Sequence, residues 1–232
     1  MTNGVIGNER DFQIAKASGL PVVMPHASRF DYKITGFAVM NTDEKAGFGS
    51  AVKSLATKGH RQIGTILLPG AYRKVIRGFT YEEYRGFLEE NGLDNARELI
   101  KNCNYEYDEV AGAVIELMRL QDPPTAIMCY SDFVALHVYR ILREMDICIP
   151  RQVAVMGYCN YPGGELLSPS LSTVDLFFEQ IGRDALDLLM DSGKWWKSGI
   201  TPPYVTTQFK VIERESTNVK MLEKELVETI LF

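Results

Sequence analysis

Two short polar segments follow apolar runs in this sequence. The pair at 131–132 comes just after the apolar run 126–129, and the tripeptide 158–160 follows the run 153–156 and one glycine. If both runs are strands of one parallel sheet, their carboxyl ends share an edge, and ligands of open parallel sheets bind at that edge. The candidate contacts are Ser131, Asp132, Tyr158, Cys159 and Asn160. The sequence therefore predicts a cleft for a small ligand at these strand ends.

Several of these side chains also have a plainer structural interpretation. Asp132 begins a predicted helix, where a carboxylate interacts favourably with the helix dipole whether or not a ligand is present. Tyr158 can stack on a ligand ring or pack in the core. Cys159 would be a reactive thiol only in an electropositive setting. Both interpretations stay open for each residue at this point.

Other residue types that carry chemistry show no catalytic or metal-binding pattern. The sequence lacks GxGxxG, GxxxxGK[ST] and GxSxG, and no pair of carboxylates is specified for acid–base work. Its three histidines and four cysteines are scattered without metal-ligand spacing. Among the histidines, His26 follows a proline at a predicted strand end and is a further candidate for the cleft. We expect no enzyme activity, no metal and no cofactor.

Composition narrows the class of protein. A chain of 232 residues makes one large domain or two small lobes, and 46% hydrophobic residues suffice for a core. The net charge is −5 and the sequence has no basic run, so this segment is not expected to bind DNA itself. There is no signal-peptide pattern at the start, and the cysteines, with Cys129 and Cys148 in apolar company, are expected to be reduced core residues. These observations predict a cytoplasmic location.

Short apolar strands alternate with amphipathic helices along the chain. The patterns predict helices over 10–17, 43–58, 80–90, 106–120, 132–145 and 177–190, and strands over 4–6, 21–24, 37–40, 63–68, 126–129, 153–156 and 204–212. Thr42 is the expected cap of the second helix. This alternation favours an α/β fold with parallel sheets flanked by helices.

Six motifs in order resemble those of LacI/GalR-type sensor domains. They are GHRQI at 59–63, PTAI at 124–127 with SDFVA at 131–135, IPRQVAVMGY at 149–158, PSLSTV at 169–174, GRDA at 182–185 and VIEREST at 211–217. Each motif is weak by itself, but six in the right order and at the right spacing are specific. The resemblance covers nearly the whole chain.

The resemblance implies a two-lobed, periplasmic-binding-protein-like I fold. The N-terminal lobe would comprise 1–59 and about 175–202, the C-terminal lobe 60–174 and about 203–216, and three crossovers would join them. A small effector, usually a sugar, would bind between the lobes and act on an attached DNA-binding domain, so that operator DNA is reached only through that domain. The intact protein would be a homodimer without membrane contact.

Site residues inferred from the resemblance differ in part from the family pattern. Asp43 is kept in the first lobe. Cys159 stands where sugar-binding relatives carry an Asp, and Ser131 replaces the Asn of their ND pair. The usual Arg falls on Thr80, with Arg77 one turn earlier. Because a carboxylate suits a pair of sugar hydroxyls, these changes leave the identity of the ligand open.

The two ends of the chain carry further expectations. Relatives place two more β-α units before the strand predicted at 4–6, so the N-terminal lobe is expected to be incomplete. The tail 217–232 is a predicted helix leading out of the domain, similar to the exit of xylose-operon-activator-like proteins. The alternatives to a regulator's sensor are a solute-binding protein of a transport system and a small α/β enzyme.

Overall fold

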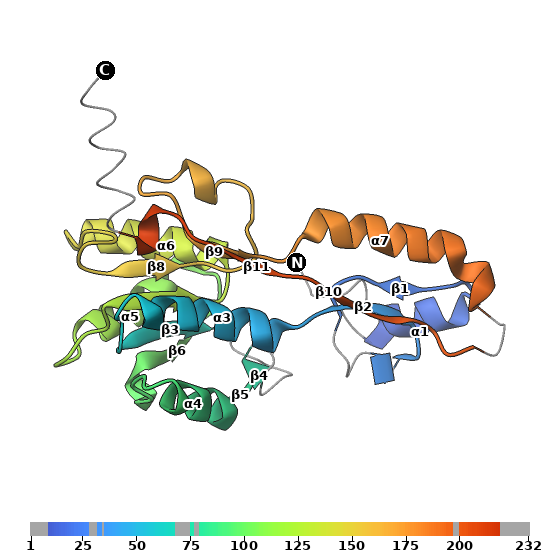
Figure 1. Cartoon of the computed structure of the whole chain (residues 1–232), viewed down its shortest axis with the longest axis horizontal. Coiled ribbons are helices and arrows are strands. Elements are labelled where there is room, and N and C mark those ends of the chain that lie inside the picture. Colours follow the sequence, from blue (N-terminus) through green and yellow to red (C-terminus); the bar gives the residue numbers. More distant parts are fainter. Residues whose placement is uncertain are drawn as a thin grey trace, which may run out of the picture. The chain divides into compact units, whose positions relative to one another are not determined.

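The chain forms two compact units in a computed structural model, which describes residues 9–27, 32–33, 35–67, 75–76, 79–196 and 200–218 (Figure 1). Unit 1 comprises 1–43 and 176–209, and unit 2 comprises 44–175 and 210–232. The chain therefore passes from one unit to the other at three points. The strand predicted at 4–6 and the predicted tail helix, apart from residues 217–218, lie outside the described residues.

Unit 2 is built on a four-stranded parallel sheet. Its strands are β3 (Ile63–Leu67), β6 (Ile100–Asn102), β7 (Ala126–Cys129) and β8 (Ala154–Met156), in the order β6-β3-β7-β8. From β3, the chain first adds β6 on one side and then β7 on the other. The order thus reverses between β3 and β7, which is the kind of switch point where open parallel sheets bind ligands.

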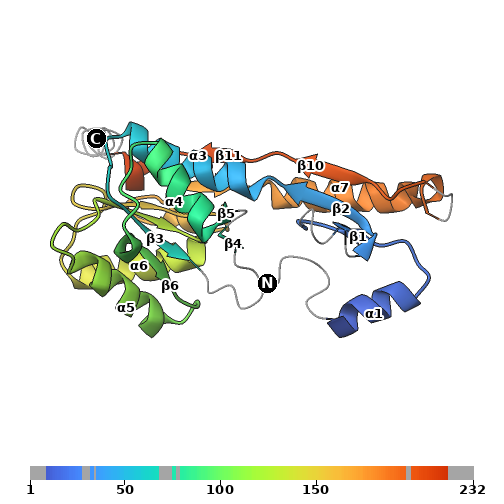
Figure 2. The same ribbon diagram turned by 90° about the horizontal axis from the view of Figure 1, so that it is seen from below.

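Helices cover both faces of this sheet. They are α3 (Glu44–Thr57), α4 (Tyr81–Glu90), α5 (Tyr107–Met118) and α6 (Asp132–Glu144). Figure 2 shows α5 and α6 together on one face, with α3 and α4 on the other. Alternation along β3 explains both contacts, because Ile66 joins the α5–α6 core whereas the Thr65 hydroxyl lies 2.9 Å from the Tyr84 hydroxyl of α4.

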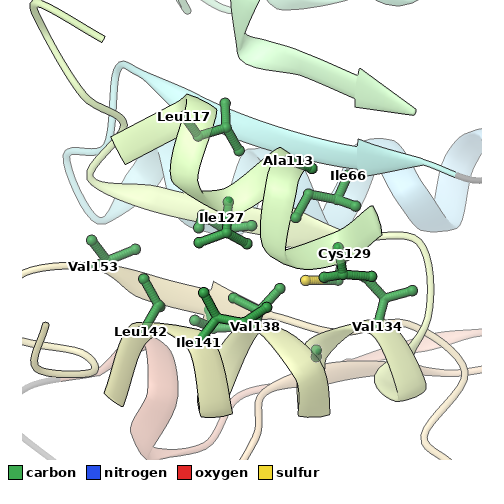
Figure 3. Close-up of a cluster of buried hydrophobic side chains, with 14 of the residues drawn as sticks. Ile66, Ala113, Leu117, Ile127, Cys129, Val134, Val138, Ile141, Leu142 and Val153 are labelled. Atoms are coloured by element: carbon green, nitrogen blue, oxygen red, sulfur yellow. The ribbon is translucent and has the colours of Figure 1, made fainter. Parts of the chain in front are cut away.

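The main core lies between the sheet and the pair α5–α6. Ile127 of β7 is fully buried there, in one cluster with apolar side chains of both helices (Figure 3). The labelled members are Ile66, Ala113, Leu117, Ile127, Cys129, Val134, Val138, Ile141, Leu142 and Val153. The i, i+3, i+4 spacing in α6 places Val134, Val138 and Ile141 on one face, which is why this helix packs as the sequence predicts.

Further short elements extend unit 2. Strands β9 (Thr173–Asp175) and β11 (Lys210–Ile212) pair antiparallel, and β4 (Val75–Ile76) pairs with β5 (Phe79–Thr80). Single bridges from Met156 to Ser172 and from Cys159 to Asp175 continue β8 toward β9. The 3-10 helices of this unit are η1 (Arg97–Leu99), η2 (Gly164–Leu166) and η4 (Glu215–Thr217).

Unit 1 is smaller. It holds the parallel strands β1 (Val23–Met24), β2 (Ala38–Thr42) and β10 (Tyr204–Thr207), in the order β1-β2-β10, and the helices α1 (Glu9–Ala17), α7 (Phe178–Met190) and η3 (Asp191–Lys194). One cluster of buried hydrophobic residues described in this unit consists of Met24, Ala27, Phe37 and Val39.

Four sequence expectations need correction. The strand predicted over 204–212 is two strands, because β10 pairs with β2 in unit 1 and β11 pairs with β9 in unit 2. Thr42 ends β2 and places its hydroxyl 2.7 Å from that of Thr207, so it does not cap α3. Thr80 ends β5 rather than beginning a helix. Cys148 is exposed in the turn after α6. The lobe boundaries expected at 59 and 202 stay a prediction. The division into two compact units assigns α3, which lies before residue 59, to unit 2.

Candidate ligand-binding site

The ends of β7 and β8 meet at the start of α6, as the sequence predicts. Ser131 caps this helix, with its hydroxyl accepting from the Val134 N–H at 3.4 Å. The next residue, Asp132, donates its N–H to the Tyr158 carbonyl oxygen at 3.0 Å. This bond joins the segment after β7 directly to the segment after β8, so the two polar segments form one cluster.

The Asp132 carboxylate holds this cluster together from inside. Its Oδ1 accepts from the Thr173 hydroxyl at 2.6 Å, and its Oδ2 accepts from the Tyr161 N–H at 2.7 Å. Its side chain lies so close to Gly157 that a Cβ on that residue would be 2.1 Å from Oδ1. Burial raises the pKa of the Asp132 carboxyl to about 6, against the lowering effect of its hydrogen bonds and of Arg214. In this arrangement Asp132 braces the loop after β8.

That loop has an unusual backbone. Cys159 and Asn160 have φ angles of 102° and 51°, in the left-handed region that side chains with a Cβ seldom adopt. Two neighbouring residues of this kind store strain, and such strain persists where the surroundings fix the conformation. Here Cys159 donates its N–H to Val174 O at 2.9 Å, and Asn160 donates its N–H to the Thr173 hydroxyl at 3.2 Å.

The Asn160 side chain is positioned by two charged partners. Its Nδ2 donates to Asp175 Oδ2 at 3.0 Å, and its Oδ1 accepts from the Arg214 guanidinium at 3.1 Å. A primary amide has two N–H donors and two acceptor lone pairs, so one donor and one acceptor remain for a ligand. Asn160 is partly exposed. It is therefore a rigid amide with hydrogen-bonding capacity at the edge of the cluster.

Arg214 belongs to the cluster, although it is not among the site residues predicted from the sequence. Its guanidinium donates to Leu171 O at 2.6 Å as well as to Asn160, and so links the tail of the domain to the loop after β8. The signal was present in the sequence, because Arg214 lies within the motif at 211–217. A single sequence does not place Arg214 at the site, because nothing in it shows that the tail returns to this edge of the sheet.

The other candidates in the cluster are buried. Ser131, Asp132, Tyr158 and Cys159 are 1%, 3%, 0% and 4% exposed, respectively. The Tyr158 ring packs against Phe48 of α3, with ring centroids 5.8 Å apart. Of the five candidates at the two strand ends, Asn160 thus has the most accessible side chain. Direct contact of the remaining four with a ligand stays a prediction.

The remaining candidates lie elsewhere. His26 and Asp43 belong to unit 1, where His26 Nδ1 lies 3.3 Å from the Thr42 hydroxyl and the His26 ring meets Phe178 edge-on. Thr80 is the last residue of β5 in unit 2. Arg77 lies outside the described residues. Their part in binding stays a prediction.

A cavity of about 490 Å³ opens at the other end of the unit-2 sheet. Gln62 and Asp122, which precede β3 and β7, lie on its wall and are joined by a 2.8 Å hydrogen bond. None of the predicted site residues that the structure describes lines it. Across the described part of the chain, no three His, Cys, Asp or Glu side chains are grouped to hold a metal, and no helix is long and apolar enough to cross a membrane.

Comparison with known proteins places this arrangement in a family. The model of the periplasmic binding protein-like domain matches residues 52–217. The HTH-type transcriptional repressor PurR of Actinobacillus pleuropneumoniae is 28% identical over 166 residues, which are 72% of this chain and 49% of the relative. The chain thus spans about half the length of that curated relative.

Solved structures share the fold. A regulatory protein of the LacI family from Chloroflexus aggregans superposes with a TM-score of 0.75 at 24% identity, covering 90% of this chain and 73% of the other. The LacI family regulator CCPA of Weissella paramesenteroides, solved with bound sucrose, gives 0.72 at 19% identity, covering 90% and 74%. The chain therefore belongs to the periplasmic-binding-protein-like domain family, with LacI/GalR-type effector-binding domains as its relatives.

Proposed function

We propose that this chain is the ligand-sensing domain of a bacterial transcription regulator. It binds a small metabolite, a sugar or sugar derivative, at the carboxyl ends of β7 and β8. Binding shifts the population of conformations and so controls an attached DNA-binding domain in the cytoplasm. The role is binding and not catalysis, which agrees with relatives that are repressors and regulators.

The observation that carries the proposal is the fixed, partly exposed amide of Asn160. It lies at the sheet edge where parallel α/β folds bind ligands, and it keeps one donor and one acceptor for a partner. A sugar hydroxyl both donates and accepts, so it matches this pair. The sucrose-bound neighbour supports the choice of ligand class.

Isothermal titration of the full chain with sucrose, glucose and a panel of other hexoses and disaccharides tests the site. We expect saturable binding of at least one sugar, weakened about tenfold in Asn160→Ala through loss of hydrogen bonds to the ligand. Asn91→Ala is the matched control, because it removes an amide bonded to a backbone carbonyl, Phe87 O, in the same unit. Unchanged affinity in Asn160→Ala would remove this residue from the site.

The regulatory role has a separate test. In the longer protein that carries this domain, a saturating sugar should change the affinity for operator DNA in a fluorescence-anisotropy titration. Sugar binding without any effect on DNA binding would favour the alternative, a solute-binding protein of a transport system. The homodimer implied by the resemblance is checked on the same sample by sedimentation equilibrium.

A further inference from the structure

A pair of aromatic rings joins the two strand ends of the candidate site, and one of its members, Tyr161, directly follows Asn160 in the chain. Phe133, the second residue of α6, and Tyr161, in the loop after β8, have ring centroids 4.8 Å apart at an interplanar angle of 32°. Phe133 keeps 47% of its surface exposed, and Tyr161 is partly buried. The two rings come from the two strand ends that form the candidate site. We call this pair the aromatic platform.

The platform is held in place by the same carboxylate that braces the loop. Asp132 directly precedes Phe133, and its Oδ2 accepts from the Tyr161 N–H at 2.7 Å. The Asp132 N–H is bonded to Tyr158 O, and its Oδ1 is bonded to Thr173. The backbone of both platform residues is therefore held at a buried residue that is hydrogen-bonded through its N–H and both carboxylate oxygens. A surface fixed before binding loses little conformational entropy when a ligand arrives.

The composition of this edge points to the ligand's chemistry. Small-molecule sites combine aromatic surface with a few placed polar groups. The platform offers apolar ring surface, and its chain neighbour Asn160 offers an N–H donor and an oxygen acceptor. A pyranose ring has the matching form, since its C–H groups make an apolar face and its hydroxyls form a polar rim.

We infer that Phe133 and Tyr161 form a stacking surface for a pyranose ring of the effector, with Asn160 bonding a hydroxyl on its rim. This inference rests on the proposed function and specifies it. It names a carbohydrate with an exposed C–H face as the ligand class, and it makes Phe133 a specificity-determining residue that the sequence motifs did not single out.

Variants at position 133 test the stacking in the full chain, with sucrose and glucose as probes. Phe133→Leu keeps an apolar side chain but removes the ring, and should weaken sugar binding about fivefold, whereas Phe133→Trp should retain it. Leu136→Ala is the matched control, because Leu136 is also exposed on α6, one turn further along. It should leave the affinity unchanged. The emission of the tryptophan introduced by Phe133→Trp should shift on addition of the sugar.

The outcomes of these experiments distinguish failure of the stacking inference from failure of the proposed sensor function. Sugar binding that is equal in wild type and Phe133→Leu overturns the stacking inference and leaves the sensor function standing. If the wild-type protein binds no sugar in the panel, the sugar class is overturned in both the proposed function and the stacking inference. Adenine serves as a planar, non-sugar probe, and preferential binding of adenine through Phe133 also overturns the pyranose assignment. A lower molecular mass of Phe133→Leu in sedimentation would instead identify the platform as an interface between copies.

Discussion

Gly157 and Asp132 approach each other closely in the candidate site. Asp132 occupies the volume that a side chain at position 157 would need, and its carboxylate accepts hydrogen bonds from Tyr161 in the loop after β8 and from Thr173 of β9. A glycine is required at 157 because of this close approach, while the backbone dihedral angles impose no such demand there.

Substitution of this glycine tests the fit. Gly157→Ala should destabilise the protein by roughly 1–3 kcal/mol, since the new Cβ would lie 2.1 Å from Asp132 Oδ1 and must displace it. Gly112→Ala is the control, because Gly112 lies within α5, a Cβ there meets nothing within 4 Å, and alanine favours helix by about 0.5–1 kcal/mol. Urea unfolding measures both changes. A loss of stability in Gly112→Ala as large as in Gly157→Ala would show that close approach is not the cause.

Asp132 should also make stability depend on pH. Its folded-state pKa of about 6 lies above the ordinary value of 3.8, so the folded protein holds this proton more tightly than the unfolded chain. The contribution is fully present below about pH 4 and is lost as the pH rises through about 6. The difference between the folded-state and ordinary pKa of Asp132 corresponds to roughly 3 kcal/mol.

Comparison of urea midpoints at pH 4.5 and 7.5 checks this dependence. The loss of stability on raising the pH should be smaller in Asp132→Asn than in wild type, because the variant cannot ionise at this position. Glu165→Gln, which changes an exposed carboxylate of the same unit, is the control and should follow wild type. Parallel pH profiles of wild type and Asp132→Asn would contradict the role assigned to this carboxyl.

At the scale of elements, the tail of the domain is bonded to β8 and to the residue just before β9. Ser216 of η4 donates its hydroxyl to Val155 O of β8 at 2.7 Å and accepts from the Ser172 N–H at 2.8 Å. Thr217 lies 2.7 Å from the Ser172 hydroxyl, oxygen to oxygen. Ser216 and Thr217, which we call the clamp, therefore hold β8 and the start of β9 together. The same motif, at 211–217, also places Arg214 against Asn160.

Loss of the Ser216 hydroxyl should lower the stability of the protein by a measurable amount. Ser216 is fully buried, so Ser216→Ala leaves the Val155 carbonyl and the Ser172 N–H without this partner and should destabilise unit 2 by about 1–3 kcal/mol. Thr201→Ala, at an exposed position, is the control and should change little. Thermal unfolding followed by circular dichroism compares them, and equal midpoints for the two variants would argue against the clamp.

At the scale of the whole molecule, the two units differ in their cores. Among the described residues, seventeen buried side chains form one hydrophobic cluster in unit 2, whereas a cluster described in unit 1 has four. Local opening is easier where fewer apolar contacts must be broken. The two units are thus expected to differ in local stability.

Hydrogen exchange followed by mass spectrometry measures that difference. Peptides that cover β7 should exchange more slowly than peptides that cover β2, although both strands are central in their sheets. A sugar that binds at the β7 and β8 ends should slow exchange in the loop 157–161 further. Equal protection of β2 and β7 without ligand would show that core size does not govern opening here.

The sequence by itself determined the elements whose signals are local. The period of apolar residues in α6, the glycines that follow α1, α3 and α4, and the apolar run of β7 all act within a few neighbouring residues, and these elements lie within one or two residues of their predicted bounds. The ordered motifs likewise identified the family. Position after a strand end was enough to bring Ser131, Asp132 and the loop 158–160 together.

Only the tertiary structure decided what each of these residues does. The division of 204–212 into β10 and β11 depends on two different partner strands, β2 and β9, that are distant in sequence. The burial of Asp132 depends on Thr173, and the position of Asn160 depends on Arg214, which lies 54 residues further along the chain. Hydrogen bonds and packing between distant segments leave no periodic signal in a single sequence. The sequence therefore predicts where the candidate site lies, while the fold separates its internal brace, Asp132, from its accessible amide, Asn160.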